Sequence, residues 1–250
     1  MVKFLMHGCN GKMGRMITEI VKNDENAVIA AGVDAYTGVP NEYPVFESID
    51  KCDVDVVIDF STASAVDGLL DYCVQKKLPV VLCTTGLSEE QLRKVEAASK
   101  ETAVLKSANM SLGINLLLKL LKDAAKVLAP AGYDMEIVER HHNQKLDAPS
   151  GTALALADSI NEEMNGEYEY VYDRSQVRRK RGKKEIGISA VRGGTIVGIH
   201  DVIFAGTDEV IEFTHTAYSR SVFAKGAVEA GRFLAGKAPG MYDMGDVVGL

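Results

Sequence analysis

Gly8-Cys9-Asn10-Gly11-Lys12-Met13-Gly14 is a glycine-rich segment with the spacing GxxGxxG, and it directly follows the short apolar run Val2–His7. Beyond the first glycines, apolar residues recur at helical spacing, at Met13, Met16, Ile17, Ile20 and Val21. Glycines allow a tight turn and a close approach to a pyrophosphate, whose charge is held by free amides at the start of the helix. The segment therefore predicts a strand, a turn and a helix that begin a dinucleotide-binding Rossmann domain.

Asp34 lies about 20 residues beyond these glycines, at the end of a second apolar run, residues 28–33. An acidic side chain at this place accepts hydrogen bonds from the ribose hydroxyls of a dinucleotide. Its carboxylate would repel the 2′-phosphate of NADPH, although the ammonium of Lys12 would offset part of that repulsion. Ala35 supplies no arginine, so the sequence favours NADH and leaves use of both NADH and NADPH open. The alternative is a structural glycine turn followed by an unrelated surface aspartate.

Further apolar runs follow at residues 54–59, 79–83 and 103–107. A helix is expected before the last of them, because Ser88 and Gln91 have the spacing of a capping box. Strands that alternate with helices predict an α/β fold with a Rossmann-like doubly wound parallel sheet.

From residue 111 the pattern changes, and a second α+β domain with a mixed or antiparallel sheet is expected. We predict helices at 111–128 and 152–164, a strand at 133–140, and hairpin signals at Gly193-Gly194 and Thr207-Asp208. A final amphipathic helix is predicted at 221–234, and the tail that contains Met241-Tyr242-Asp243-Met244 is expected to return to the first domain. The predicted domains are 1–110, completed by 217–250, and 111–216.

Two loops that follow predicted strands are candidates for the rest of a cofactor site. They are Cys83-Thr84-Thr85-Gly86 and Ser107-Ala108-Asn109-Met110. Loops after strand ends form the usual ligand side of an open α/β sheet, and small polar residues there would admit a nicotinamide and its ribose. Each loop alone is equally consistent with an ordinary connection.

The densest group of chemically active side chains is residues 139–152, which contain His141, His142 and Lys145 directly after a predicted strand. Histidine exchanges a proton near neutral pH, and lysine binds an anion or acts as an acid. A zinc site is a rival interpretation, but neither a cysteine nor a convincing acidic third ligand completes the set. A purely structural histidine pair is the other alternative.

Ser150 precedes a predicted helix, so it is expected to be the N-cap, and the amides of Gly151 and Thr152 would then be free to bind a carboxylate. Simple helix capping is the alternative. Together with His142 and Lys145, these residues describe a pocket for a small acid that carries more than one carboxylate.

Composition narrows the class of protein. The net charge of -7 disfavours a general nucleic-acid binder, and no apolar stretch approaches the roughly 20 residues needed to span a bilayer. Four cysteines without CxxC spacing are expected to be reduced packing residues of a cytoplasmic protein, namely Cys9, Cys52, Cys73 and Cys83. The basic run at 178–184 is expected to be a solvated loop, with phosphate binding or an interface as alternatives.

These residues resemble those of the 4-hydroxy-tetrahydrodipicolinate reductase family, also called dihydrodipicolinate reductases, of the bacterial lysine and diaminopimelate pathway. The resemblance spans nearly the whole chain and rests on the segment 139–152, and the stretch HHxxKxDAPSGTA, residues 141–153, is its most specific part. It also rests on three shorter segments, Lys12-Met13-Gly14-Arg15, Thr84-Thr85-Gly86 and Arg192-Gly193-Gly194-Thr195.

The resemblance implies an NAD(P)H-dependent reduction of a cyclic dicarboxylate, with loss of water, by a homotetramer built through the second domain. It implies that His141 is the acid/base residue and Lys145 the proton donor, and that His142, Ser150, Gly151 and Thr152 bind the substrate. The implied cofactor-binding residues are Gly8, Cys9, Asn10, Gly11, Lys12, Met13, Asp34, Cys83, Thr84, Thr85, Ser107, Ala108, Asn109 and Met110. No metal site is implied.

Two positions depart from the family pattern. Cys83 stands where a glycine is expected, which puts the fit of that loop in doubt, and Asp34 is followed by Ala35 and not by an arginine, which weakens the case for NADPH. Two other functions stay open. One is another two-domain reductase, such as a homoserine or semialdehyde dehydrogenase, and the other is a nucleotide sensor that has lost its chemistry.

Overall fold

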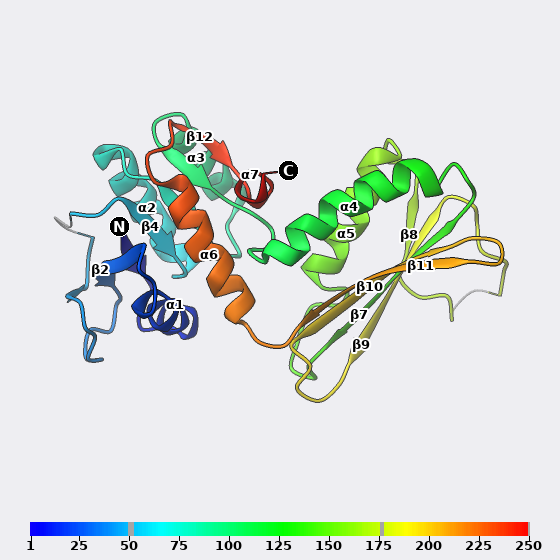
Figure 1. Cartoon of the computed structure of the whole chain (residues 1–250), viewed down its shortest axis with the longest axis horizontal. Coiled ribbons are helices and arrows are strands. Elements are labelled where there is room, and N and C mark those ends of the chain that lie inside the picture. The colour runs from blue at the N-terminus through cyan, green and yellow to red at the C-terminus, as the bar shows by residue number, and fades with distance from the viewer. Residues whose placement is uncertain (50–52, 176–177, 250) are drawn as a thin grey trace. The chain divides into compact units, whose positions relative to one another are not determined.

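The computed structural model describes residues 1–49, 53–175 and 178–249, so the predicted packing residue Cys52 lies outside the described residues. The chain forms two compact units (Figure 1). The first unit is Met1–Leu112 together with Ser221–Gly249, and the second unit is Gly113–Arg220.

A seven-stranded sheet forms the centre of the first unit, in the order β12-β6-β5-β4-β1-β2-β3. All neighbouring strands in it run parallel. The strands are β1 (Val2–His7), β2 (Ala27–Val33), β3 (Val45–Phe46), β4 (Val56–Asp59), β5 (Val80–Leu82), β6 (Ala103–Leu105) and β12 (Gly240–Tyr242). The strand order reverses between β1 and β4, which is where a doubly wound sheet opens to a ligand at its carboxyl edge.

Helices cover both faces of this sheet, because side chains along each strand alternate in direction. In β1, Phe4 and Met6 belong to the core beneath α1 (Lys12–Lys22) and α6 (Ser221–Leu234). Leu5 belongs to the core beneath α2 (Ala63–Lys76) and α3 (Glu89–Ser99). All three side chains are fully buried, so the sheet is a rigid support for the loops at its carboxyl edge.

The second unit contains a five-stranded mixed sheet in the order β11-β10-β7-β9-β8. Its strands are β7 (Asp134–His141), β8 (Glu169–Val171), β9 (Glu185–Arg192), β10 (Gly198–Ala205) and β11 (Val210–Ala217). β10 is antiparallel to β7 and β11, whereas β9 is parallel to β7 and β8. α4 (Leu112–Leu128) and α5 (Gly151–Glu163) pack on one face, over a core that includes Met135, Ile137 and Leu156.

The predicted α/β fold class with a second mixed sheet is confirmed, as are the bounds Val2–His7 and Ser221–Leu234. The capping box between Ser88 and Gln91 is present, and the expected return of the tail is confirmed by the pairing of β12 with β6.

Three details were wrong or missing. Gly193-Gly194 is not a hairpin turn, because β7 lies between the two strands that it joins. The helix 221–234 is not the final one, since α7 (Met244–Val248) follows it. The structure also adds α2, whose buried residues Val66, Leu69, Leu70 and Cys73 have helical spacing.

The basic run is a largely exposed loop, as predicted, with one exception. The side chain of Arg181 is only 18% exposed and forms ion pairs with Asp134 at 2.8 Å and Glu136 at 2.9 Å. Arg181 is therefore a structural residue that ties the loop to β7. Of the helices in the described ranges, none combines the length and apolar character that crossing a membrane requires.

Candidate active site

The glycine turn connects β1 to α1 and needs its glycines for steric reasons. Gly8 has φ of +81°, and a Cβ there would lie 2.6 Å from the carbonyl oxygen of Phe60. A Cβ on Gly14 would overlap the carbonyl oxygen of Gly8. The turn thus leaves backbone amides at the start of α1 accessible to a closely bound ligand, with Gly11 and Lys12 exposed and Met13 packed against the core. These residues fit a dinucleotide.

Asp34 lies at the carboxyl end of β2 and is joined directly to the glycine turn. Its Oδ2 accepts a hydrogen bond from the backbone N–H of Asn10 at 2.9 Å, and its Oδ1 accepts one from the N–H of Tyr36 at 3.1 Å. The side chain of Cys9 is fully buried, against Gly32. The structure therefore brings Asp34 and the turn residues together, whereas the buried side chain of Cys9 is not accessible to a ligand.

The two other predicted loops meet at the carboxyl ends of β5 and β6. Cys83, Thr84 and Thr85 from one loop, and Ser107 and Ala108 from the other, line a cavity of about 240 Å³ that also contains Lys106. Burial raises the pKa of the Cys83 thiol, which keeps it neutral. The backbone of Met110 lies against Gly226 of α6, where a Cβ would overlap its carbonyl oxygen.

A buried polar network beneath these loops was not predicted. The carboxylate of Asp59 is fully buried at the end of β4. It lies 2.7 Å from Nδ1 of His7, accepts a hydrogen bond from the hydroxyl of Thr84 at 2.6 Å, and accepts one from the N–H of Ser61 at 3.2 Å. Three strand ends of the sheet are thereby linked, and the side chain of Thr84 is held in place.

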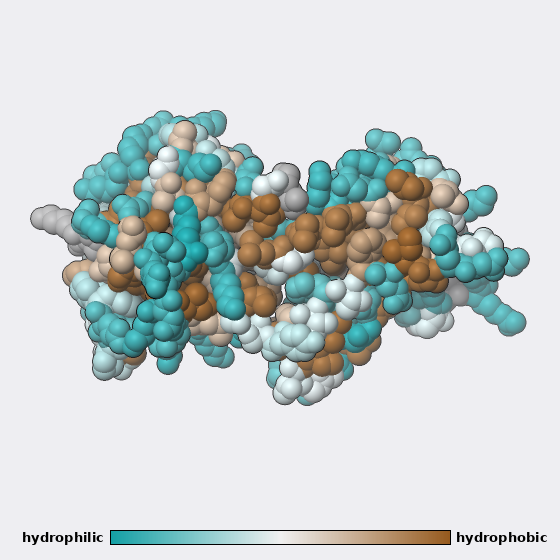
Figure 2. Space-filling view, in the orientation of Figure 1, coloured by the Kyte–Doolittle hydropathy of each residue, from teal (hydrophilic) through white to brown (hydrophobic). Residues whose placement is uncertain are grey.

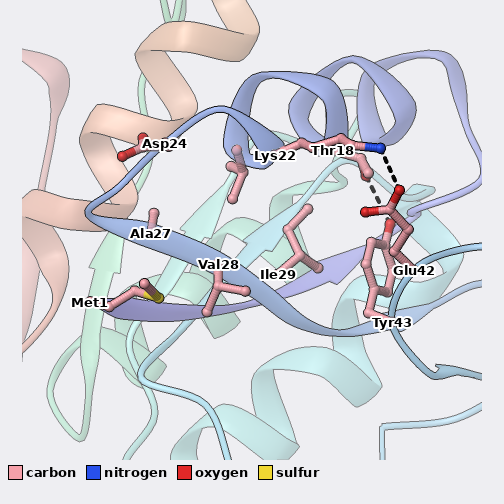
Figure 3. Close-up of a pocket in the computed structure, with 10 residues that line it drawn as sticks. Met1, Thr18, Lys22, Asp24, Ala27, Val28, Ile29, Glu42 and Tyr43 are labelled. Carbon is pink, nitrogen blue, oxygen red and sulfur yellow. Dashed lines mark hydrogen bonds and ion pairs between the residues drawn. The ribbon is translucent and has the colours of Figure 1, made fainter.

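A second cavity, of about 310 Å³, lies between α1 and β2 (Figure 3). Thr18 and Tyr43 form a hydrogen bond of 2.8 Å across it, and Lys22 pairs with Glu42 at its rim. Its lining includes Ala27, Val28 and Ile29 from the amino end of β2. Because ligands bind at the carboxyl ends of parallel strands, this cavity is not part of the candidate site.

In the second unit, strand register gathers a polar cluster on the face that the helices cover. Along β7 the buried apolar residues Met135 and Ile137 are followed, at the same period of two, by Glu139 and His141. The neighbouring strands place His200 opposite Glu139 and Arg192 opposite His141. The polar cluster is therefore a continuation of the hydrophobic core at one end of the sheet.

Glu139 is the centre of this cluster and is fully buried. Its Oε2 lies 2.6 Å from Nδ1 of His141 and its Oε1 accepts a hydrogen bond from the N–H of Ser150 at 3.0 Å. Nη1 and Nη2 of Arg192 donate to the two carboxylate oxygens. Burial alone would raise the pKa of Glu139, but the hydrogen bonds from Arg192, His141 and Ser150 outweigh burial and lower the pKa below its ordinary value. Glu139 is thus a carboxylate at neutral pH.

Ser150 caps α5 as predicted, since its Oγ accepts a hydrogen bond from the N–H of Ala153 at 3.1 Å. Gly151 and Thr152 form the first turn of the helix. Lys145 lies in the preceding loop, with its Nζ 2.8 Å from Oδ1 of Asp147. The hydrogen bond from Lys145 lowers the pKa of Asp147. His142 follows His141 directly and is half-buried.

His200 is a further member of the cluster that was not predicted. It is 4% exposed, and its Nε2 lies 3.0 Å from Oγ of Ser150. Its ring meets that of His141 edge to face, with centroids 5.1 Å apart. Burial, and to a smaller extent the charge of nearby His141, lowers the pKa of His200 to about 4. Among the described residues, no group of three or more His, Cys, Asp or Glu side chains is arranged to hold a metal ion.

The first unit is a doubly wound sheet with a glycine turn and an acidic residue after β2. The second unit carries a histidine–carboxylate pair beside a helix N-terminus. Together these features define a nicotinamide-dinucleotide-dependent oxidoreductase. Comparisons identify the family. Residues 2–110 match the family model "Dihydrodipicolinate reductase, N-terminus", and residues 113–248 match "Dihydrodipicolinate reductase, C-terminus". The chain belongs to the dihydrodipicolinate reductase family.

Full-length relatives agree with this assignment. The chain is 53% identical to the 4-hydroxy-tetrahydrodipicolinate reductase of Caldanaerobacter subterraneus subsp. tengcongensis, over 99% of this chain and 98% of the relative. It is 54% identical to the enzyme of the same name from Clostridium tetani, over 98% and 96% of the two chains. The dipicolinate-bound dihydrodipicolinate reductase from Paenisporosarcina sp. TG-14 is similar in structure, with a TM-score of 0.79, 25% identity and 97% of each chain covered.

Proposed function

We propose that this protein reduces 4-hydroxy-tetrahydrodipicolinate to tetrahydrodipicolinate, with loss of water and with NADH or NADPH as reductant, in diaminopimelate and lysine biosynthesis. Membership of the reductase family supports the reaction. The observation that carries the proposal is the buried Glu139, which holds both His141 and the N-cap Ser150 and so joins an acid/base group to a carboxylate site.

The first unit is proposed to bind the cofactor. The glycine turn from Gly8 to Met13 would hold the pyrophosphate, Asp34 would accept from the adenosine ribose, and the loops Cys83–Thr85 and Ser107–Met110 would hold the nicotinamide end. When bound, the cofactor supplies a hydride. A carboxylate at position 34 favours NADH over NADPH, so we propose a preference for NADH.

The second unit is proposed to bind the substrate, a small cyclic dicarboxylate. The N-terminus of α5, formed by Ser150, Gly151 and Thr152, would receive one carboxylate, because backbone amides and the helix dipole favour negative charge there. His142 lies in the loop that leads to this helix and would contribute a further hydrogen bond. A dipicolinate-bound relative is consistent with this class of ligand.

His141 and Lys145 are proposed to handle the proton. The buried carboxylate of Glu139 accepts from Nδ1 of His141, which leaves Nε2 as the nitrogen available for acid/base work. Gly198 gives that nitrogen room, because a Cβ there would lie only 3.1 Å from it. Lys145, whose ammonium is 2.8 Å from Asp147, would donate the proton that the substrate takes up.

We propose that the protein is a homotetramer assembled through the second unit. α4 and α5 cover one face of its sheet, and the opposite face carries the partly exposed residues Val138, Ile199 and Ile203. The outer side of α4 also exposes Leu116, Leu120 and Val127, and Figure 2 shows hydrophobic residues gathered over this helix. Apolar surface of this kind is typical of subunit interfaces. With Cys9, Cys73 and Cys83 as free thiols, we propose a cytoplasmic location.

The proposed function is tested by following nicotinamide absorbance. The substrate is generated from pyruvate and aspartate semialdehyde by a coupling synthase, and oxidation of NADH and of NADPH is measured. We expect oxidation that depends on the synthase and is faster with NADH at low cofactor concentration. Protein that binds NADH but shows no synthase-dependent oxidation with either cofactor would contradict the proposal and favour a nucleotide sensor.

A further inference from the structure

The two ring nitrogens of His200 have different surroundings. Nε2 lies 3.0 Å from Oγ of Ser150. Nδ1 is buried and has no hydrogen-bond partner within the part of the chain that the structure describes. The ring as a whole is 4% exposed. The position of the single proton on a neutral His200 ring is therefore decided by the protein and not by solvent.

Burial keeps His200 neutral at pH 7, since its pKa is lowered to about 4. A neutral imidazole carries one N–H, on one of its two nitrogens. A buried N–H without an acceptor is rarer in proteins, and costs more, than a buried acceptor without a donor. The proton therefore lies on Nε2, and Nε2–H donates to Oγ of Ser150.

Oγ of Ser150 also accepts the hydrogen bond from the N–H of Ala153, at 3.1 Å, that caps α5. A serine hydroxyl has two acceptor lone pairs and one O–H donor. Ala153 and His200 together fill both lone pairs. The hydroxyl of Ser150 is then left with its donor alone, at the N-terminus of α5 where an anion is favoured.

We propose that His200 is a positioning residue for substrate recognition: by donating from Nε2 to Ser150 Oγ, it commits the Ser150 hydroxyl to donate to a carboxylate of the substrate. This inference rests on the proposed function, because it deepens the role given to Ser150. It explains why a histidine is buried here with one nitrogen unsatisfied. A ligand that presents a hydrogen-bond donor at this place finds no acceptor on Ser150.

The first test is a double-mutant cycle between the two residues. His200→Phe keeps a ring but removes the donor, and His200→Gln keeps an amide N–H near the place of Nε2. We expect His200→Phe to raise the KM for the substrate about three- to tenfold, as loss of one hydrogen bond would, with kcat changed less than about twofold. His200→Gln restores most of the KM. In a Ser150→Ala background, His200→Phe is expected to raise KM no further.

Controls separate recognition from folding. His215→Gln makes the same substitution on β11, opposite His200 in the strand register, and is expected to leave KM unchanged. NADH binding and the thermal unfolding temperature of each variant report whether both units are intact. If His200→Phe raises KM equally in the wild-type and in the Ser150→Ala background, the inference is overturned, because the effect of His200 then does not depend on the serine hydroxyl.

A second test measures the protonation of His200 directly in the wild-type protein. Long-range ¹H–¹⁵N spectra of ¹⁵N-histidine-labelled wild-type protein, assigned by the signal that His200→Gln removes, report which ring nitrogen is protonated. A protonated Nε2 supports the inference, and a protonated Nδ1 overturns it. Wild-type protein without turnover would contradict the proposed function, and with it the inference. Normal turnover together with a protonated Nδ1 contradicts the inference alone.

Discussion

Arg192 donates two hydrogen bonds to the carboxylate of Glu139: Nη1 lies 2.7 Å from Oε2, and Nη2 lies 2.7 Å from Oε1. Such a bidentate pair fixes the plane of the carboxylate as well as its position. The same two oxygens receive Nδ1 of His141 and the N–H of Ser150. The orientation of His141, the proposed acid/base residue, and that of Ser150, in the proposed carboxylate site, are therefore set by one ion pair.

Glu139→Gln removes the charge of this carboxylate and keeps its size. We expect kcat to fall about 10- to 100-fold, because the ring of His141 loses the acceptor that fixes its tautomer and stabilises its protonated form. NADH affinity is expected to stay the same, since the glycine turn belongs to the first unit. The measurement is steady-state turnover of the variant beside wild type.

Glu136→Gln is the matched control for this substitution. Glu136 lies on the same strand, but its carboxylate pairs with Arg174 and Arg181. Its variant is expected to keep its kcat. If both variants lose turnover to the same extent, the loss comes from damage to β7 and Glu139 has no special role.

Gly198→Ala tests the space around His141. The new Cβ would lie 3.1 Å from Nε2 of His141 and would push the ring from its place. We expect kcat to fall about tenfold, because the nitrogen that we propose for acid/base work is displaced. Gly193→Ala serves as the control, because its Cβ would meet no atom of the described residues within 4 Å. Equal turnover of the two variants would show that Nε2 of His141 is not used.

Asp34→Asn tests cofactor choice. The amide keeps an acceptor for the N–H of Asn10, which Asp34 now contacts at 2.9 Å, but loses the negative charge. We expect the ratio of NADPH affinity to NADH affinity to rise about tenfold, because repulsion of the 2′-phosphate is removed. Dissociation constants from nucleotide fluorescence measure it, with the exposed Asp53→Asn as control. An unchanged ratio would mean that another group selects the cofactor.

The buried His200 predicts how stability depends on pH. In the unfolded chain a histidine binds its proton near pH 6.5, whereas in the folded protein His200 does so only near a pKa of about 4. Between these values the unfolded state binds more protons, so stability falls as the pH falls. The expected contribution of this group is on the order of 3 kcal/mol across the window.

The measurement is the free energy of unfolding in urea at several pH values from 7 to about 4, for wild type and His200→Gln. The difference between the two proteins isolates His200 from carboxylates and from His215, whose pKa burial also lowers. We expect a flatter pH dependence for the variant. Parallel curves would mean that His200 is protonated alike in the folded and unfolded states.

The elements that were predictable from the sequence are those whose signal is local. The glycine spacing after Val2–His7 predicts the first strand, turn and helix, and the capping box predicts the start of α3. β3, β8 and β12 are only two or three residues long, and no apolar run of the kind that predicted β5 and β6 marks them in the sequence. The prediction of a hairpin at Gly193-Gly194 is wrong because turn residues indicate that the chain reverses direction but do not indicate which strands pair with each other.

The residues of the candidate site likewise divide into those with a local sequence signal and those that only the fold brings together. His141, Lys145 and Ser150 lie within one continuous stretch of the sequence, so they were candidates before any fold was known. Arg192 and His200 come from two other strands, and only the register of the sheet places them beside Glu139 and His141. A single histidine in an apolar strand looks like any packing residue. The pair of His7 and Asp59 is also not predictable from the sequence, because the two residues are 52 positions apart and only the fold brings them together.

The first unit is closed by a distant part of the chain. β12 and α6 complete its sheet and its core only after the whole second unit, Gly113–Arg220, has been traversed. During synthesis on the ribosome, the nascent second unit is therefore available for folding while the nucleotide-binding sheet still lacks its last strand. A chain that stops before residue 221 therefore lacks both the strand at one edge of this sheet and the helix that packs on its core.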